Sequence, residues 1–474
     1  MQITKREFLK QLGLVSAVGM GGVALGDEFV ASKDGLPLGS CGDPANPWFG
    51  KNIFPLGHTV EDGPSCFLKD GEVCEPAKKI PVFHRTDVVV VGGGPAGFAA
   101  AVSAARIGAK VALVERYGSL GGLFTNGMVL IMLCTSVNED GKWRLVTKGL
   151  CEEFMHRAEA LGADVTTANP GPSQHWQPTV DPEGAKYLMD RMIAENGVEM
   201  FFHSWGVDVI QDGARVLGVV FESKEGRQAI LAKQVVDCTG DADMLFRAGG
   251  DYRQITHGIG PVVRLGNMDR VTAKTVPVGA DGKRFPGVWP TRSNEANRST
   301  WWGNSGCGPK GNGLDVRDLT AAEIAFRKEW WEHVREMRKT PGWEQVFIAN
   351  TCSQIGPRAT RLIAAELTVD RASIKRGQDF EDVIGWIGAD GPHNGFKVSY
   401  RSILPKGVDN LLCAGRCLGA GDTIDAFRLI CPCFVTGQAA GIAAALAVEH
   451  GVTPRRLAYS DVRKALEKAK CYLG

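Results

Sequence analysis

The segment from residue 87 to residue 115 constrains the fold of this chain most strongly. A run of β-branched apolar residues, Asp87-Val-Val-Val-Val91, is followed at once by Gly92-Gly-Gly94-Pro95-Ala96-Gly97. A stretch with a small-residue face (99–105) then leads to a second apolar run (110–114), which ends in Glu115. A continuous apolar run is typical of a parallel strand that is buried on both faces. The segment therefore predicts a strand, a helix and a second strand in a parallel sheet.

The glycine spacing in this segment is that of a dinucleotide-binding turn. Gly92 permits the tight turn, Gly94 lets the backbone approach a pyrophosphate, and Gly97 lets the helix pack closely on the strand. The first helical turn, which contains Pro95 and Ala96, faces the phosphates. We expect Glu115 to accept hydrogen bonds from ribose hydroxyl groups.

A second glycine-rich turn distinguishes FAD from NAD. Arg116 is followed by Gly118-Ser-Leu-Gly121-Gly122 and then by Thr125-Asn126-Gly127, a layout that carries the backbone past the pyrophosphate toward a flavin. This arrangement resembles the glutathione-reductase-type FAD fold. More closely, it resembles the large family of bacterial FAD-dependent oxidoreductases that are distantly related to fumarate reductase flavoproteins.

The resemblance recurs along residues 80–474. It is carried by Phe201–Val207, by Val235–Asp243 with its Asp-Cys-Thr-Gly-Asp-Ala-Asp sequence, by 356–382, by Ser399–Cys417, and by Gln438, which we expect to open the final helix. The resemblance implies an α/β protein with an FAD-binding Rossmann-type parallel sheet, a crossover β-sheet and an inserted α+β substrate cap. It also implies cofactor contacts from Val207, Thr239, Gly240, Asp241, Arg358, Gly415, Arg416, Gln438 and Ala440, in addition to Arg116, Gly121, Gly122 and Thr125.

Length and charge are those of an ordinary globular protein. The chain has 474 residues and a formal net charge of +1, so no electrostatic footprint for nucleic acid or an anionic membrane is present. We expect an export signal (1–26), an extended arm (27–80), a first FAD-binding part (81–250), the substrate cap (251–395) and a second FAD-binding part (396–474).

The N-terminus has the layout of a signal peptide. A charged stretch, Thr4–Lys10, precedes apolar and small residues from Leu12 to Leu25. This layout resembles a twin-arginine (Tat) signal with Lys5 in place of the first arginine, which implies export to the periplasm or cell surface. The alternative is an amphipathic N-terminal helix of a cytoplasmic protein. Cys41, Cys66 and Cys74 in the arm match no metal spacing, and a disulfide after export stays open.

The expected cap is rich in tryptophan. Thr320 and Glu323 have the spacing of a capping box, which predicts a helix that starts there and ends before Pro341. The rings would form an aromatic wall for a planar or glycan-like substrate, or they would pack the cap onto the FAD domain or a partner subunit. Seven of the 11 Trp residues lie in this region: Trp289, Trp301, Trp302, Trp330, Trp331, Trp343 and Trp386.

Four residues are candidates for catalysis: His257, Arg264, Arg401 and Arg428. In the fumarate reductase relatives, Arg and His clamp substrate carboxylates and deliver a proton while flavin N5 delivers hydride. The alternative is that these side chains form structural ion pairs. The sequence departs from the family between Leu418 and Arg428, where it has acids, including Asp425, in place of the expected His.

The cysteines Cys413, Cys417, Cys431 and Cys433 form a dense group. Four thiolates could hold an iron–sulfur cluster, or two could act as a redox dithiol. We favour small buried hydrophobic residues on a packed strand and helix, and we predict no metal site.

Together these features predict an FAD-dependent oxidoreductase that moves a hydride between flavin N5 and a small organic substrate under a Trp-rich cap. After residue 97 there is no second GxGxxG with its strand and helix, and no CxxC follows the first βαβ unit, so a nicotinamide domain and a disulfide-reductase layout are not expected. Electrons would pass through the substrate, a partner protein or a quinone-like carrier. The alternatives are an electron-transfer subunit and a flavin monooxygenase, and a homo-oligomer stays open.

Overall fold

The computed structural model describes residues 66–272, 288–290, 301–304, 310–372, 380–388 and 395–474. The chain divides into two units, Met1–Lys78 and Lys79–Gly474. In the first unit, β1 (Phe67–Lys69) and β2 (Glu72–Cys74) form an antiparallel hairpin whose turn, Asp70-Gly71, has positive φ at both residues. The predicted export signal and Cys41 lie outside the described residues.

A seven-stranded sheet organises the second unit. Five strands run parallel in the order β7 (Glu199–Phe201), β4 (Val111–Val114), β3 (Val82–Val91), β10 (Gly226–Asp237) and β22 (Leu411–Cys413). β9 (Arg215–Ser223) pairs antiparallel with the first part of β10, and β8 (Trp205–Asp212) pairs antiparallel with β9. The predicted α/β class, with a parallel Rossmann-type sheet and an antiparallel crossover sheet, is confirmed.

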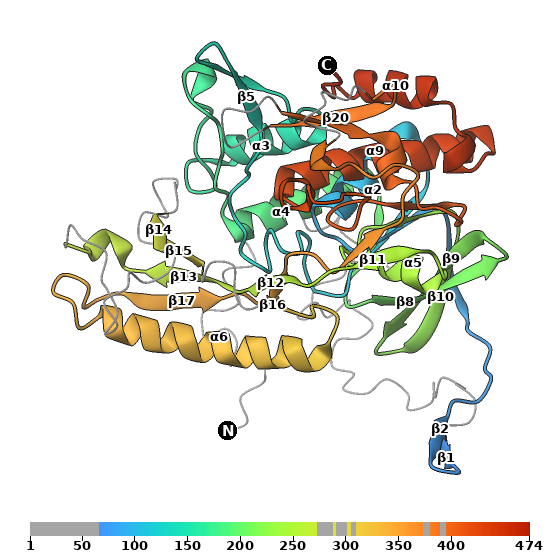
Figure 1. The fold of residues 1–474 in the computed structure, drawn as a ribbon, viewed down its shortest axis with the longest axis horizontal. Coiled ribbons are helices and arrows are strands. Elements are labelled where there is room, and N and C mark those ends of the chain that lie inside the picture. The colour runs from blue at the N-terminus through green and yellow to red at the C-terminus, as the bar shows by residue number, and fades with distance from the viewer. Residues whose placement is uncertain (1–65, 273–287, 291–300, 305–309, 373–379, 389–394) are drawn as a thin grey trace, which may run out of the picture. The chain divides into compact units, whose positions relative to one another are not determined.

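The sheet is buried on both faces, as the apolar run of β3 predicts. Val88 and Val90 pack in one core cluster with α2 (Pro95–Ile107) and α9 (Ile430–His450). Val89 and Val91 point the other way and pack against residues of β9, β10 and α5 (Asp243–Arg247). Figure 1 shows α2 and α9 together over one side of the sheet.

Helices α2 and α9 touch through glycine. A Cβ at Gly437 would lie 2.0 Å from the carbonyl oxygen of Ala96, and a Cβ at Gly441 would lie 2.1 Å from that of Ala100. In the described part of the chain α9 is also the one helix long and apolar enough to cross a membrane, but its apolar window is wholly buried in the protein. Its packing is that of a core helix.

The start of α9 corrects the sequence prediction. The helix begins at Ile430, two turns before Gln438, which was expected to open it. Pro432 lies in the first turn, where a backbone N–H has no partner within the helix, so proline does not interrupt it. Gln438 is consequently a buried residue in the helix interior.

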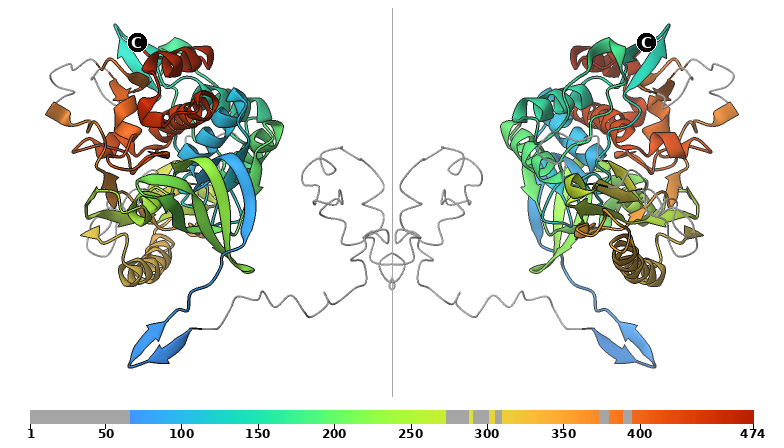
Figure 2. Two further views of the ribbon diagram at one scale, coloured as in Figure 1. Left: turned by 90° about the vertical axis from the view of Figure 1, so that its right-hand side faces the viewer. Right: turned by 90° about the vertical axis from the view of Figure 1, so that its left-hand side faces the viewer.

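Three further helices pack with α2 and α9: α3 (Leu150–Leu161), α4 (Pro182–Glu195) and α10 (Tyr459–Lys468). The hairpin of β5 (Ser136–Glu139) and β6 (Lys142–Leu145) precedes α3. In Figure 2 the helices α9 and α10 lie at one end of the second unit, and α6 (Val316–Met337) lies at the other end.

The region predicted as the cap forms its own small sheets. One antiparallel sheet has the order β14 (Val288–Pro290), β15 (Trp301–Asn304), β13 (Val262–Gly266) and β17 (Phe347–Thr351), and α6 runs alongside it (Figure 1). Other strands of this part of the chain form separate short antiparallel sheets: β11 (Tyr252–Gln254) with β19 (Arg361–Ile363), β12 (His257–Gly260) with β16 (Lys310–Gly311) and β18 (Gly356–Pro357), and β20 (Val383–Ile387) with β21 (Phe396–Ser399).

Helix α6 starts earlier than the predicted capping box. The Asp315 side chain accepts hydrogen bonds from the backbone N–H groups of Arg317 and Asp318 and is the N-cap. Thr320 therefore lies inside the helix, where its hydroxyl donates to the carbonyl oxygen of Val316. Asp and Thr side chains can both accept hydrogen bonds from the unpaired amides at a helix start. In this helix Asp315 takes that role, and the Thr-x-x-Glu pattern lies within the helix.

Two of the tryptophans pack the core of this region. Trp330 and Trp343 are fully buried in a cluster with residues of β13, whereas Trp331 is 60% exposed. For Trp330 and Trp343, packing of the region is therefore the observed role. The side chains of Trp289, Trp301 and Trp302 lie outside the described residues.

A half-buried carboxylate on α4 gives a test of how burial affects the stability of the fold. Asp190 on α4 is half-buried, and its Oδ1 has no hydrogen-bond partner among the described residues. Burial raises the pKa of Asp190 to about 6. Because the folded protein binds this proton more tightly than the unfolded chain, the stability falls as the pH rises from about 4 to about 6.

We therefore predict that Asp190→Asn stabilises the protein at neutral pH. The free energy of unfolding should rise by about 1 kcal/mol at pH 7, a value reduced for the solvation that the side chain keeps. The gain should vanish below the pKa of the unfolded carboxyl, since the wild-type carboxyl is then neutral in both states. Denaturant unfolding at several pH values measures this difference, with the exposed Asp212→Asn as control. A variant less stable than wild type at pH 7 would contradict the prediction.

Candidate active site and cofactor cleft

A cleft lies where the parallel strands of the sheet end. It encloses about 840 Å³ counting its open mouth, and it is lined by residues that follow β3, β4, β10 and β22, together with the start of α9. This is the edge of a parallel sheet at which dinucleotides bind in doubly wound folds.

The first glycine turn is shaped by contacts that exclude side chains. Gly92 has a φ of +99°, and a Cβ there would lie 2.5 Å from the carbonyl oxygen of Cys238. A Cβ at Gly97 would lie 1.7 Å from the carbonyl oxygen of Gly92. Gly94 differs, because nothing lies within 4 Å of its Cβ position although the residue lines the cleft. The open space in the cleft therefore begins at Gly94.

The second glycine turn returns to the first one. The Gly121 N–H donates to the carbonyl oxygen of Gly93 at 2.8 Å, and a Cβ at Gly122 would lie 3.1 Å from the Cα of Gly94. Thr125 closes the turn by donating from its hydroxyl to the carbonyl oxygen of Leu120. Gly122 consequently lines the cleft, and Gly121 and Thr125 support it from behind.

Glu115 lies at the end of β4 with both carboxylate oxygens engaged. It accepts from the N–H of Gly93 at 2.6 Å and from the N–H of Tyr117 at 2.9 Å. Burial raises its pKa, and these two amides act against that rise. Because each carboxylate oxygen has more than one acceptor site, Glu115 can brace the glycine turn and still accept from a ligand hydroxyl.

Asp237, at the end of β10, holds the turn on the other side of the cleft. One oxygen accepts from the backbone N–H and the hydroxyl of Thr239, and the other accepts from the N–H groups of Met244 and Leu245 at the start of α5. The residue is fully buried. Burial, with repulsion from the Asp243 carboxylate, raises its pKa to about 6.

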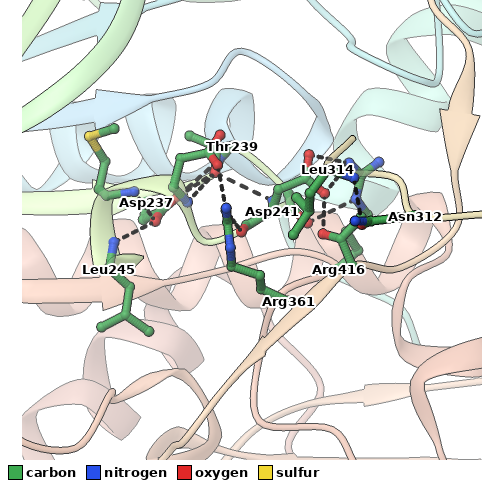
Figure 3. A network of polar contacts seen from close by, with 12 residues as sticks. Asp237, Thr239, Asp241, Leu245, Asn312, Leu314, Arg361 and Arg416 are labelled. Atoms are coloured by element: carbon green, nitrogen blue, oxygen red, sulfur yellow. Dashed lines mark hydrogen bonds and ion pairs between the residues drawn. The ribbon is translucent and has the colours of Figure 1, made fainter. Parts of the chain in front are cut away.

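Arg416 closes the cleft through a buried ion pair (Figure 3). Its Nη2 donates to both oxygens of Asp241 at 2.7 and 2.8 Å, and its Nε donates to the carbonyl oxygen of Gly240 at 2.8 Å. Thr360 donates to the Asp241 carboxylate, and Arg361 donates to the Asp241 carbonyl oxygen at 2.9 Å. The network joins the segments after β10, at β19 and after β22, which are far apart in the sequence.

The predicted cofactor residues fall into two groups. One group lines the cleft: Gly92, Gly94, Pro95, Ala96, Glu115, Arg116, Gly122, Thr239, Gly240, Gly415 and Arg416. The other group does not line it: Gly97, Gly121, Thr125, Val207, Asp241, Arg358, Gln438 and Ala440. Among the latter, Asp241 acts through Arg416, and Gln438 lies too far along α9 to reach the cleft.

Several lining residues were not predicted. Ser204, Trp205 and Gly206 lie one to three residues before the predicted Val207, at the start of β8. Ile430 and Cys433 belong to the first turn of α9. Gln354, from the loop after β17, had no local sequence signal, since only the fold brings that loop to the cleft.

Two of the four predicted catalytic residues meet. Arg428 lines the cleft, and its Nε and Nη2 both donate to Oδ1 of Asp425 at 3.2 Å. His257 lies 3.1 Å from the same oxygen through Nε2. Since the Gly258 N–H donates to Nδ1 of His257, the imidazole carries its proton on Nε2 and donates it to Asp425. Asp425 is one of the acids that stand where histidine was expected.

Charge is unevenly distributed around this group. Burial and repulsion from Arg358 lower the pKa of Arg428. Burial alone would raise the pKa of Asp425, but Arg428 and His257 hold it below its usual value. Arg358 and Arg428 are thus two cations close to each other beside the cleft. The side chain of Asp425, which pairs with Arg428, is 55% exposed.

The other two predicted catalytic residues form structural ion pairs. Arg264 donates to Asp181 at 3.4 Å, and Asp181 is the N-cap of α4. Arg401 donates to Asp382 at 3.0 Å, and the same carboxylate accepts from Ser399. Neither arginine lines the cleft. Sequence alone could not separate these roles, because the partners are 83 and 19 residues away.

The four C-terminal cysteines are buried and divided between two core clusters. Cys413 and Cys417 pack on one face of the sheet, and Cys431 and Cys433 pack on the other face. Burial raises the pKa of all four thiols, that of Cys433 to about 12. No group of three or more His, Cys, Asp or Glu among the described residues is placed to hold a metal ion.

Unsatisfied polar atoms show that the cleft suits a flavin dinucleotide. Gln354 lines the cleft, and its Oε1 is buried without a partner in the described residues. Asn126 is buried behind the second glycine turn, and its Nδ2 also lacks a partner there. The unused acceptor of Gln354 in the cleft, together with the free space at Gly94 and the N-terminus of α2 beside it, fits FAD.

Comparison with known proteins supports this fit. The family model described as FAD dependent oxidoreductase matches residues 87–466. The chain belongs to this family. FAD is therefore its cofactor and it is an oxidoreductase, as predicted.

Individual relatives are similar over limited stretches. Dihydrolipoyl dehydrogenase from Trypanosoma brucei brucei is 56% identical over 46 residues, which is 10% of each chain. Dihydrolipoyl dehydrogenase 3 from Pseudomonas putida is 31% identical over 160 residues, 32% of this chain and 30% of that protein. The chain thus spans less than a third of these relatives. A geranylgeranyl bacteriochlorophyll reductase-like protein from Thermoplasma acidophilum has a TM-score of 0.40 at 15% identity, covering 82% of each chain.

Substitutions at Gly94 and Gly97 should affect different properties, cofactor binding at Gly94 and folding stability at Gly97. Gly94→Ala places a methyl group in the open cleft at an unstrained φ of −67°, so we predict stability within about 1 kcal/mol of wild type. FAD affinity should fall about tenfold or more, because the methyl group takes cofactor space. Gly97→Ala should instead destabilise the fold by about 3 kcal/mol, since its Cβ overlaps a backbone carbonyl. FAD titration and denaturant unfolding measure the two effects, and unchanged FAD affinity in Gly94→Ala would contradict the assignment.

Proposed function

We propose that this FAD-dependent oxidoreductase transfers a hydride between N5 of FAD and a small organic anion. The observation that supports this proposal most directly is Arg428, a cation that lines the same cleft as Glu115. In a fold of this kind the acid at the end of the second strand marks the ribose end of the dinucleotide. The isoalloxazine would then lie near Arg428 and Gln354.

Arg428 binds and orients the substrate in this proposal. A guanidinium presents several N–H donors in one plane, which suits a carboxylate. Asp425 contacts Nε and Nη2, so it fixes the plane of the guanidinium. Repulsion from Arg358 favours a second negative charge beside Arg428, and a substrate carboxylate would supply that charge.

His257 holds a proton next to this group. Its Nε2–H is directed at Asp425, and the backbone N–H of Gly258 fixes the tautomer. In the proposed reaction His257 is a positioning residue, because it holds Asp425 against the Arg428 guanidinium, and the proton that accompanies hydride transfer is exchanged with solvent. FAD, when bound, supplies the hydride donor or acceptor. The loop that carries Gln354, after β17, would cover the substrate from the cap side.

The test is anaerobic bleaching of the flavin absorbance by a panel of small organic acids, each paired with its uncharged amide. We predict that an acid bleaches the oxidised flavin or restores it from the reduced form, and that its amide does neither. Arg428→Gln should lower the second-order rate constant for that acid by roughly ten- to a hundredfold, because a charge-assisted contact is lost. The matched control is Arg463→Gln, since Arg463 is an exposed arginine on α10.

Two outcomes would contradict the proposal. Bleaching only by a nicotinamide cofactor, followed by oxygen-dependent hydroxylation, would indicate a flavin monooxygenase. Electron exchange only with a protein partner would indicate an electron-transfer subunit.

We also propose that residues 1–26 export the folded protein. The support is the charged stretch with Lys5-Arg6 ahead of the apolar residues 12–25. Cell fractionation of the full chain should find the flavoprotein outside the cytoplasm, and Arg6→Gln should retain it inside, with Lys10→Gln as the control. Equal cytoplasmic retention of wild type and Arg6→Gln would overturn this proposal.

A further inference from the structure

We infer that the chain has a second ligand site, for an amphiphilic organic monocarboxylate, between α2, α3, α9 and α10. The cavity there encloses about 1360 Å³ counting its open mouth, which exceeds the cofactor cleft. The two cavities share no lining residue. The four helices pack together on the side of the sheet shown with α9 and α10 in Figure 1. This inference does not depend on the proposed function.

The cavity has an apolar wall with an unused hydrogen-bonding group. Ile107, Leu150, Ile442, Ala465 and Ala469 supply apolar surface. Ser103 lines the same cavity, is 4% exposed, and has a hydroxyl with no hydrogen-bond partner among the described residues. Buried hydroxyl groups are normally paired, so this hydroxyl is placed to bind a partner from outside the chain, either water or the head of a ligand.

Gln438 and the start of α3 add to the polar part of the wall. The buried Gln438 side chain accepts from the Leu150 N–H at 2.9 Å through Oε1. Gly149 makes this contact possible, because a Cβ there would lie 2.4 Å from that oxygen. The next amides of the first turn of α3 have no acceptor within the helix. Donor groups therefore predominate at this end of the cavity.

The charged rim favours an anion. Arg106 is neutralised by Glu153, to which it donates at 2.6 and 2.9 Å. Lys468 and Lys470 also line the cavity, and neither has an ion-pair partner in the described residues. Glu152 is the remaining lining carboxylate, and His156 is held by Glu159 at 3.2 Å. Three cations thus face two carboxylates.

A ligand that matches this wall has an apolar chain and one negatively charged head that accepts hydrogen bonds. A carboxylate accepts from hydroxyl, amide and ammonium groups together. Pockets of this kind combine mostly apolar lining with a few polar groups that orient the ligand. An aliphatic carboxylate satisfies Ser103 and the two lysines while its chain covers Ile107 and Ile442.

Isothermal titration of the FAD-loaded full chain with sodium octanoate tests this inference, and 1-octanol serves as the uncharged comparison. We expect octanoate to bind and octanol to bind about tenfold more weakly. Ser103→Ala should weaken octanoate binding about fivefold without lowering the melting temperature, because the hydroxyl makes no contact in the free protein.

Further variants locate the binding. The double variant Lys468→Ala, Lys470→Ala should weaken octanoate but not octanol, whereas Ala465→Trp should fill the cavity and abolish binding of both. Lys464→Ala is the control, since Lys464 is exposed on α10 and does not line the cavity. The flavin absorbance should be the same in all variants.

Several results would overturn the inference. They are no octanoate binding, octanoate binding that survives Ala465→Trp, equal affinity for octanol and octanoate, or a loss of melting temperature in Ser103→Ala. An Ala465→Trp variant that changes the oligomeric state would also overturn it, because the cavity would then be part of a subunit interface.

Discussion

The approach of α2 to the turn after β3 determines the rest of this structure. At Gly97 and Gly92 the helix and the strand lie so close that no side chain fits between them. The same is true of α9 against α2 at Gly437 and Gly441. These contacts bring the N-terminal ends of both helices to the edge of the sheet where β3, β10 and β22 end. The cofactor cleft is the space that remains there.

Buried charge completes the cleft at considerable energetic cost. Asp237 ends β10 and Asp241 lies four residues later, and each is satisfied by several donors rather than by one partner. Removing one member of such a buried network typically costs about 3–5 kcal/mol, because it leaves a charge without a partner. The network has a geometric consequence, because Arg416 joins segments that are more than 170 residues apart in the sequence. The network therefore holds these segments together beside the cleft.

Sequence predicted the parts of the fold that depend on neighbouring residues. The end of β3, the glycine turn and the start of α2 lie within the eleven residues 87–97, so a local sequence pattern predicts them. The start of α9 was misplaced because an apolar run with proline near its beginning is compatible with a strand as well as a helix. The aspartate cap of α6 was missed for a similar reason, since the two capping patterns, at Asp315 and Thr320, lie five residues apart.

The candidate site was less predictable because it is assembled by tertiary contacts. His257 and Asp425 are 168 residues apart, and Asp425 was noticed only as a departure from the family pattern. Arg264 and Arg428 are both arginines, but they have different surroundings. Arg264 pairs with Asp181, the N-cap of α4, whereas Arg428 lines the cleft. Only the fold separates these two roles.

The most direct test of the account is a crystal structure of the chain with FAD bound. We predict that the adenosine lies between Glu115 and Trp205, that the pyrophosphate lies against Gly94, and that the isoalloxazine lies beside Gln354 and Arg428. An isoalloxazine at the Trp205 end, or a dinucleotide bound outside this cleft, would contradict it.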